Sequence, residues 1–480
     1  MSLLLRVLSL GATLALAVPA CAGGGLPPQV SAALKASGLP LKSFGLYVRP
    51  VDSELPAALA ELNAEQPFQL ASTAKVVTSL AALRLLGSDH QWRSHAFATG
   101  PMVRGRLAGD LVIGGAEAGL TPADLRRWFA QMRSEGLSEV SGRIVLDHVA
   151  LLQDPPSLSL ASAADGGGAE PTPRGGGRLV VQVAPAAGPR ASIALRPAVG
   201  VQVINDVAMG GGCSVYARWK TTLGAGTATP AVWVSGRWDK TCGSRDAATL
   251  NLPQGLPVGV AAALPPAPVS PAATVAQLWR EAGLRVRGGV VEARKPTPAA
   301  AAGWSSQLFT SMADRLRDIN KPSLNVGAQR LLLALAGSGT GDPLPRARSR
   351  LQGWLRDEGL KDDDVTIELG SGQSHNERGK PRAMVQLLHN AWRNGGTQSL
   401  VDSLPVAGVD GTLVNRLRRG TASGRAYLKT GTLSDTRALA GYVVGKSGRV
   451  YAVAAMVNHP QAARGTPALD AVIEWVARNG

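Results

Sequence analysis

The chain has 480 residues, 45% of them hydrophobic, and carries 50 Lys plus Arg against 34 Asp plus Glu, for a formal net charge of +16. Its length and apolar content exclude global disorder and predict two or three domains, or one domain with a large insertion. Three cysteines are too few for a disulfide framework or a zinc cluster, and with aromatics at 4% there is no stacking surface for nucleic acid, so no nucleic-acid partner is expected.

Residues 1–22 are organised like a secretory signal peptide. Arg6 precedes an apolar run over residues 7–18, and the small residues Ala20 and Ala22 follow it. The run is shorter than the roughly 20 residues that span a bilayer. We therefore expect export to the periplasm or cell envelope. A lipid anchor at Cys21 is compatible with the sequence, although Pro19 disfavours it.

Removal of this leader leaves two cysteines, Cys213 and Cys242, in the mature chain. In an oxidising compartment a disulfide between them is the natural expectation, and two unpaired thiols are the alternative.

Hydrophobic periodicity and turn residues predict the elements along the chain. The clearest helix places Val76, Leu80 and Leu83 on one face and ends at Gly87. Composition marks linkers at residues 161–177 and 265–271. Helices are predicted over residues 27–37, 72–86, 122–135, 274–282, 307–317, 325–336 and 467–476, and strands over residues 45–51, 110–113, 143–146, 179–183, 201–204, 232–234, 427–430, 439–444 and 450–457.

The order of these elements predicts an α+β fold. Residues 23–95 and 296–480 would form one domain in two halves, an antiparallel sheet flanked by helices. A strand-rich insertion over residues 96–295 would separate the halves, with an inner subdomain near residues 160–255.

A first chemical motif is Ser72-Thr73-Ala74-Lys75. A serine hydroxyl is a weak nucleophile that needs a base, and one helical turn brings Lys75 to the same face as Ser72. The serine would also lie at a helix start, where free N–H groups favour negative charge. Taken alone, the motif is better explained by a capping serine beside a solvated lysine.

Two further motifs follow later in the chain. Lys429-Thr430-Gly431 lies on a predicted strand edge, where a cation, a hydroxyl and a glycine suit an extended peptide with a carboxylate end. Ser323-Leu324-Asn325 combines a proton-relaying hydroxyl with an amide, although helix capping explains it as well. Ser374-His375-Asn376 is a rival match for the same pattern.

Other sites are disfavoured. The chain has no Gly-x-Ser-x-Gly elbow, its nearest approach to a phosphate loop has Ala440 in place of the first glycine, and its six histidines form no His-x-x-x-His pair. The arginines at 346, 348 and 350 alternate and form no basic run. We therefore expect no metal and no cofactor.

Together the motifs resemble a known family. Ser-x-x-Lys, Ser-x-Asn and Lys-Thr-Gly in this order are typical of penicillin-binding proteins and class A β-lactamases. The flanking residues 69–78 (QLASTAKVVT), 370–374 (GSGQS), 404–413 (LPVAGVDGTL) and 429–434 (KTGTLS) are similar to D-alanyl-D-alanine carboxypeptidase/endopeptidases of the penicillin-binding-protein-4 type. That family also has a large insertion between its first two motifs, as here. Ser374 falls inside the family's Gly-Ser-Gly segment, so Ser323-Leu324-Asn325 is the better third motif.

The resemblance implies catalytic roles. Ser72 would attack the carbonyl of the penultimate D-alanine and form an acyl-enzyme, and neutral Lys75 would take its proton. Because a lysine ordinarily titrates near about 10.4, burial or a nearby cation such as Lys429 has to lower its pKa. Ser323 would pass a proton to the leaving amine.

It also implies binding roles. Asn325 would hold the substrate amide, while Lys429, Thr430 and Gly431 would bind the terminal carboxylate strand. The backbone N–H groups of the nucleophile and of Thr432 would form the oxyanion hole.

We therefore expect a serine-type D-Ala-D-Ala carboxypeptidase that also cleaves cross-links. Its partners would be peptidoglycan stem peptides, with β-lactams as inhibitors and a peripheral association with the anionic envelope. The alternatives are a β-lactamase-like hydrolase that deacylates fast and a non-catalytic envelope-binding protein on the same scaffold.

Overall fold

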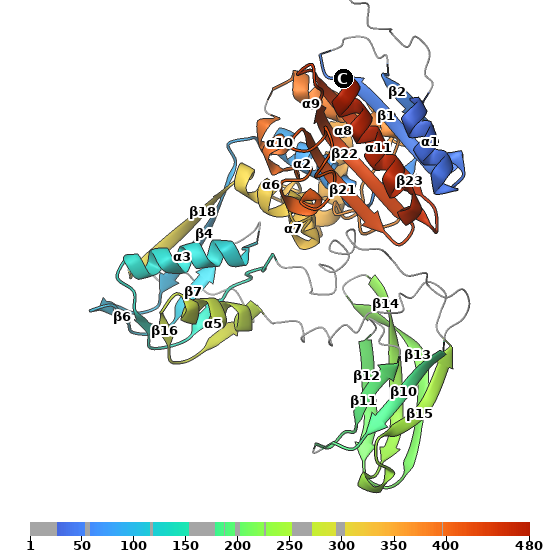
Figure 1. The fold of residues 1–480 in the computed structure, drawn as a ribbon. Coiled ribbons are helices and arrows are strands. Elements are labelled where there is room, and N and C mark those ends of the chain that lie inside the picture. The colour runs from blue at the N-terminus through green and yellow to red at the C-terminus, as the bar shows by residue number, and fades with distance from the viewer. Residues whose placement is uncertain are drawn as a thin grey trace, which may run out of the picture. The chain divides into compact units, whose positions relative to one another are not determined.

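The computed structural model describes residues 26–52, 58–115, 119–152, 178–186, 188–196, 202–224, 227–251, 271–293, 303–395 and 397–480 (Figure 1). The predicted leader with Cys21, the linker at 161–177 and all but the last residue of the linker at 265–271 lie outside these residues. The chain divides into two compact units, Met1–Ser88 with Asn320–Ser323 and Leu331–Gly480, and Asp89–Ile319 with Leu324–Arg330.

The first unit is built on a five-stranded antiparallel sheet in the order β2-β1-β23-β22-β21. Its strands are β1 (Phe44–Pro50), β2 (Ala60–Leu62), β21 (Ala426–Leu433), β22 (Thr436–Val444) and β23 (Val450–Asn458), and β3 (Phe68–Gln69), β19 (Val365–Thr366) and β20 (Arg378–Gly379) form a small second sheet. Its helices are α1 (Pro28–Ser37), α2 (Ala74–Leu85), α8 (Pro343–Asp357), α9 (Pro381–Arg393), α10 (Gln398–Ser403) and α11 (Thr466–Asn479).

The strands of this sheet are buried on both faces. Along β22, Leu439 and Val443 belong to the core that α1 and α11 complete, with Leu469 and Val472 from α11. On the other face the Tyr442 hydroxyl donates to the Leu388 carbonyl of α9 at 2.8 Å. Figure 1 shows α1 and α11 lying together along the sheet. A sheet covered by helices on both faces explains the nearly continuous runs of apolar residues in β22 and β23.

Helix α2 differs from its expected one-sided pattern. Every residue from Ala74 to Leu83 is buried, including Lys75 and Thr78. The apolar stripe seen in the sequence is therefore one part of a helix surrounded by protein. Ser72 lies just before α2, in a short 3-10 turn, η2 (Ala71–Thr73).

The second unit contains a sheet in the order β17-β9-β7-β4-β18 and a smaller one in the order β16-β8-β6-β5. Trp128, Phe129 and Trp279 pack the helices of this unit onto a common core. The elements are β4 (Gln91–Ala98), β5 (Met102–Val103), β6 (Arg106–Leu107), β7 (Leu111–Gly114), α3 (Pro122–Ser134), β8 (Glu139–Val140), β9 (Ile144–Leu146), α5 (Pro271–Glu281), β16 (Arg285–Val286), β17 (Val290–Glu292), β18 (Ser305–Ser311) and α6 (Met312–Asn320), followed by α7 (Asn325–Ala334), whose last residues belong to the first unit.

Residues 307–317 were predicted as one helix, and this prediction is wrong. The segment is the strand β18 followed by α6. Ser306, Leu308 and Thr310 are buried while their neighbours are not, and β18 pairs antiparallel with β4 more than 200 residues earlier, through Leu308 and Ser94 among others. The alternating burial belongs to a strand, and its partner is too distant in sequence for local periodicity to reveal.

Six inner strands form two three-stranded sheets, β11-β10-β15 and β12-β14-β13, around a core of their own that includes Val181, Val232 and Trp238. Cys213 at the start of one of these strands and Cys242 in a short 3-10 turn form a disulfide, with Cα atoms 5.7 Å apart. The strands are β10 (Arg178–Ala184), β11 (Ser192–Arg196), β12 (Gln202–Met209), β13 (Cys213–Gly224), β14 (Thr227–Trp238) and β15 (Arg245–Asn251). In the part of the chain that is described, no helix is long and apolar enough to cross a membrane.

Candidate active site

Ser72 and Lys75 meet at the start of α2. Lys75 Nζ donates to the Ser72 Oγ at 3.0 Å. The turn before the helix is tight, because Ala71 has a φ of 44° in the left-handed region that favours glycine. Backbone strain of this kind collects at functional sites, where the surroundings hold it in place. The contact lets a neutral Lys75 receive the hydroxyl proton of Ser72.

A glycine-containing loop closes over this pair. Lys75 Nζ donates to the Ser371 carbonyl oxygen at 2.6 Å. The loop lies directly on the nucleophile turn, since a Cβ added at Gly372 would fall 1.7 Å from the Ala71 carbonyl oxygen. Only glycine allows this approach.

Lys429 on β21 lies against the same centre. Its Nζ donates to the Ser323 Oγ at 2.9 Å and to the Thr430 carbonyl oxygen at 3.1 Å. The side chains of Lys75 and Lys429 are both fully buried. Burial, together with the positive charge of Lys75, holds the pKa of Lys429 well below its usual range.

Ser323 lies in a short turn between α6 and α7 and has a φ of 64°. Two neighbouring side chains hold this turn. The Asn320 amide donates to the Ser79 and Ser403 hydroxyls at 3.1 and 2.9 Å. Lys321 Nζ pairs with the Asp410 carboxylate at 2.7 Å. The hydroxyl of Ser323 is thus fixed in reach of Lys429.

The edge strand β21 carries the remaining predicted residues of the first unit. Thr430 Oγ1 and Thr412 Oγ1 are 2.7 Å apart and share a hydrogen bond. A Cβ at Gly431 would lie 2.8 Å from the Leu70 carbonyl oxygen, so the strand lies against the nucleophile turn. Gly431 and Thr432 pair with β22 on one side, and β21 is last in the sheet order, which suits addition of an extended peptide to its other side.

Asn325 is the first residue of α7, two residues after Ser323, and it belongs to the second compact unit. The structure thus brings Ser72, Lys75, Ser323 and Lys429 together, and a role for Asn325 rests on the motif alone.

Sequence patterns did not reveal two contributors to the site. Thr412 lies in the 404–413 segment, but no motif marks it. Ser371 acts through its backbone carbonyl, which leaves no side-chain signature.

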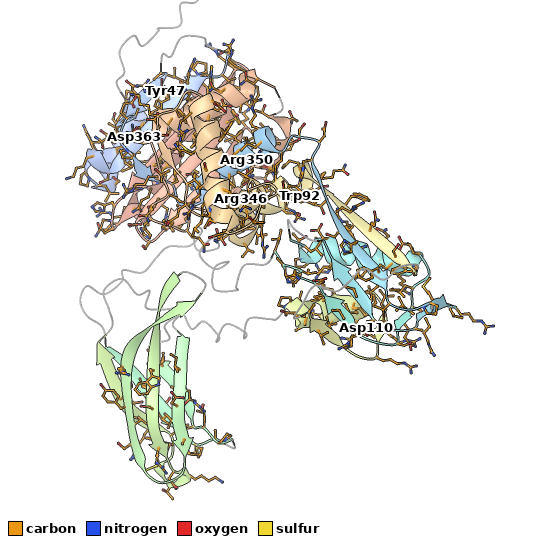
Figure 2. All side chains as sticks on the ribbon, turned by 180° about the vertical axis from the view of Figure 1, so that it is seen from behind. Tyr47, Trp92, Asp110, Arg346, Arg350 and Asp363 are labelled. Carbon is orange, nitrogen blue, oxygen red and sulfur yellow. A yellow bond between two sulfur atoms is a disulfide. The ribbon has the colours of Figure 1, made fainter. Side chains whose placement is uncertain are left out.

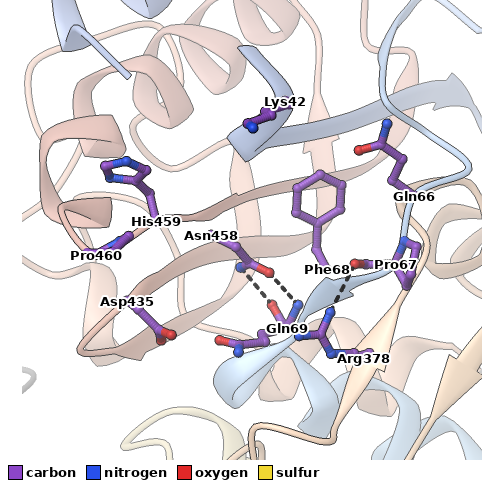
Figure 3. Close-up of a pocket in the computed structure, with 10 residues that line it drawn as sticks. All are labelled: Lys42, Gln66, Pro67, Phe68, Gln69, Arg378, Asp435, Asn458, His459 and Pro460. Atoms are coloured by element: carbon purple, nitrogen blue, oxygen red, sulfur yellow. Dashed lines mark hydrogen bonds between the residues drawn. The ribbon is translucent and has the colours of Figure 1, made fainter. Parts of the chain in front are cut away.

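A polar pocket of about 310 Å³ lies beside the segment that leads into Ser72 (Figure 3). Its lining includes Lys42, Gln69, Arg378, Asp435 and Asn458. The described residues contain no cluster of His, Cys, Asp or Glu that could hold a metal ion.

Chemically, the arrangement pairs a hydroxyl with a buried amine that can act as its base, and adds a second hydroxyl, a second buried lysine and the edge strand β21. These are the parts of covalent acyl transfer through a serine nucleophile.

Comparisons with solved structures show the fold. The chain is similar to penicillin-binding protein 4 from Haemophilus influenzae, with 21% identity, a TM-score of 0.51 and coverage of 90% of this chain and 93% of that one. It is also similar to the Bd0816 predatory endopeptidase from Bdellovibrio bacteriovorus, with 14% identity, a TM-score of 0.53 and coverage of 90% and 92%. The α+β penicillin-binding fold expected from the motifs is confirmed.

Sequence comparisons show the family. A D-alanyl-D-alanine carboxypeptidase from Actinomadura sp. is 28% identical over 434 residues, which cover 83% of this chain and 75% of the relative. The D-alanyl-D-alanine carboxypeptidase DacB of Haemophilus influenzae is 22% identical over 423 residues, covering 83% and 82%. The model of the D-Ala-D-Ala carboxypeptidase 3 (S13) family matches residues 26–479. The chain belongs to this family and is a serine-type carboxypeptidase, as its motifs indicated.

Proposed function

We propose that the protein removes the terminal D-alanine from peptidoglycan stem peptides through an acyl-enzyme on Ser72, and that it also cleaves D-alanyl cross-links. The observation that carries this proposal is the 3.0 Å contact between Ser72 Oγ and Lys75 Nζ, in the interior of the first unit beside the Lys-Thr-Gly strand. β-Lactams would acylate the same serine.

The proposed mechanism proceeds through an acyl-enzyme. Ser72 Oγ attacks the penultimate D-alanine carbonyl while Lys75 takes the hydroxyl proton. The backbone N–H groups of Ser72 and Thr432 stabilise the oxyanion, a contribution of about 3–4 kcal/mol for each donor in other enzymes. Ser323 passes a proton to the leaving amine, which departs as D-alanine, and the proton held by Lys75 is returned to Ser323. Water then attacks the acyl carbonyl, and the serine regains its proton.

Substrate binding would use the charges of the site. Lys429 and Thr430 bind the terminal carboxylate, and Asn325 holds the amide of the stem peptide. Because Lys429 is desolvated, its interaction with a carboxylate is stronger than at a surface.

The compartment is part of the same proposal. The leader at 1–22 would export the chain to the periplasm, where its substrate lies, and a disulfide between Cys213 and Cys242 is consistent with an oxidising compartment. We propose that the catalytic domain, expected over residues 23–95 and 296–480, corresponds to the first compact unit, with the second unit inserted between its halves.

The test is covalent labelling with a fluorescent penicillin. The mature protein should be labelled at a 1:1 ratio, and Ser72→Ala should abolish labelling while remaining folded. Ser447→Ala, in the exposed hairpin between β22 and β23, is the matched control and should label normally. Label retained in Ser72→Ala would overturn the assignment of the nucleophile. Release of D-alanine from purified muropeptides then tests the substrate.

A further inference from the structure

Glu377 carries a fully buried carboxylate that the mechanism above does not use. Its Oε1 accepts hydrogen bonds from the backbone N–H groups of Leu369 at 2.9 Å and Gly370 at 2.5 Å, and from that of Glu368 at 3.2 Å. Its Oε2 accepts from the N–H of Gly372 at 2.6 Å. Three of the four donors therefore converge on Oε1 and one on Oε2, so both oxygens of the side chain hold this loop.

The loop over residues 368–372, which donates these hydrogen bonds to Glu377, also contacts Lys75, the proposed base. Between two of the bonded N–H groups lies Ser371, whose carbonyl oxygen accepts from Lys75 Nζ at 2.6 Å. The adjacent Gly370 carbonyl accepts from the Thr78 hydroxyl of α2 at 2.8 Å. The direction of the Ser371 carbonyl therefore depends on the loop conformation, which the hydrogen bonds to the Glu377 carboxylate stabilise.

The backbone of Glu377 also holds the nucleophile segment. Its carbonyl oxygen accepts from the N–H of Leu70 at 2.9 Å, two residues before Ser72. The next residue, Arg378, pairs with Gln69 across β20 and β3. Glu377 thus contacts both the loop whose Ser371 carbonyl accepts from Lys75 Nζ and the segment that leads into Ser72.

We propose that Glu377 is the positioning residue for the catalytic base, holding the Ser371 carbonyl that orients the Lys75 amine toward Ser72. The inference rests on the proposed function in assuming that Lys75 is the base. It adds a residue that touches no substrate, and whose effect should appear in the acylation step and not in substrate binding.

The experiment compares Glu377→Gln with the unmodified mature protein in pre-steady-state acylation by penicillin. A glutamine has one acceptor oxygen and turns an NH₂ group toward backbone donors, so the loop loses at least one bond. We expect the acylation rate constant to fall by about 10- to 100-fold, because small misplacements of catalytic groups have effects of this size. The dissociation constant of the initial complex should change by less than about threefold. The labelling stoichiometry counts folded molecules, so partial unfolding does not affect the measured rate.

Glu474→Gln is the matched control. The Glu474 carboxylate also accepts from backbone N–H groups, those of Thr421 at 2.8 Å and Ala422 at 3.4 Å. Neither of these bonds involves the loop that contacts Lys75. It should acylate at the unmodified rate. Equal rates in Glu377→Gln and the unmodified protein, or equal losses in both variants, would overturn the proposal.

A crystal structure of Glu377→Gln supplies a readout independent of activity. The expected result is a separation of Lys75 Nζ from the Ser371 oxygen beyond hydrogen-bond distance, and an unchanged contact would contradict the proposal. If penicillin fails to label even the unmodified protein, the proposed function fails, while this structural readout still decides the positioning role. Should Glu377→Gln not fold, Glu377→Asp is measured in the same way, and failure of both to fold would show a purely structural residue and overturn the proposal.

Discussion

Lys429 is a single residue whose burial lowers the stability of the fold. It is fully buried, and burial and the charge of Lys75 lower its pKa well below the ordinary value. Between that lowered pKa and about 10.4 the unfolded chain binds the proton more tightly than the folded one, so the free energy of unfolding rises with pH across this window. At pH values below about 10.4 the buried Lys429 amine therefore destabilises the fold.

From this follows a prediction for Lys429→Met. The variant should lose acylation by penicillin yet gain about 1–2 kcal/mol in free energy of unfolding at pH 7, since replacing buried charge by a packed apolar chain is often stabilising. The gain should shrink as the pH approaches about 10.4. Urea unfolding at several pH values measures it, with Lys446→Met in the exposed hairpin as a control that should change little. A less stable Lys429→Met protein would contradict the assigned cause.

For Asp318 in the second unit, the free energy of unfolding changes with pH in the opposite direction. Its pKa is raised to about 6, mainly by burial, with Arg315 opposing the shift and Asp124 adding to it. A carboxyl whose folded pKa lies above its unfolded value stabilises the fold at low pH, and this contribution is lost as the pH rises through about 6.

Asp318→Asn should therefore be more stable than the unmodified protein at pH 7 and equal to it near pH 4. With the side chain 31% exposed, solvent reduces the effect, and we expect about 1 kcal/mol. Thermal unfolding at the two pH values tests this. Asp362→Asn is the contrasting control. Because Arg356 lowers the pKa of Asp362, this substitution should reduce the stability at pH 7 and not increase it. A gain for Asp318→Asn that persists at pH 4 would show a cause other than titration.

At the scale of elements, sequence patterns predicted what local periodicity determines. β22, β23 and α11 have long apolar patterns and appear close to their expected bounds. The strand β18 was missed because its partner β4 is distant in sequence. In the candidate site, the spacing of Ser72 and Lys75 suffices to find the pair. Glu377 could not be found in this way, because it acts on backbone groups that any sequence supplies.

The inner strands offer a prediction at this scale. The Cys213–Cys242 disulfide spans a sequence separation of 29 residues, and closing a loop of this length restricts the unfolded chain by about 3–4 kcal/mol. Replacing both cysteines by serine should lower the stability of these strands by roughly that amount while leaving penicillin acylation unchanged. Hydrogen exchange resolved by peptide measures the first, and labelling measures the second. Loss of labelling in the double variant would show that the strands and the site are coupled.

The whole molecule has an excess of basic side chains, and many of them have local partners. Arg346 and Arg350 of α8 (Figure 2) donate to the carbonyl oxygens of Thr340 and Leu335, each at 2.7 Å. Arg348 between them donates to the Glu368 carbonyl at 2.7 Å. These contacts stabilise loops without neutralising the charge. The net charge of +16 therefore remains available for long-range attraction to an anionic polymer.

On the proposed function that polymer is peptidoglycan, so binding should depend on salt. The screening length falls from about 10 Å at 0.1 M to about 3 Å at 1 M ionic strength. Ser72→Ala protein, which cannot turn over its substrate, should sediment with purified cell-wall sacculi at low salt and be released several-fold at about 0.5 M. Amidation of the carboxylates of the sacculi is the matched control and should weaken binding to the same extent. If neither salt nor amidation changes the fraction of protein that sediments, short-range contacts in the site account for the binding. The excess positive charge would then require a different partner.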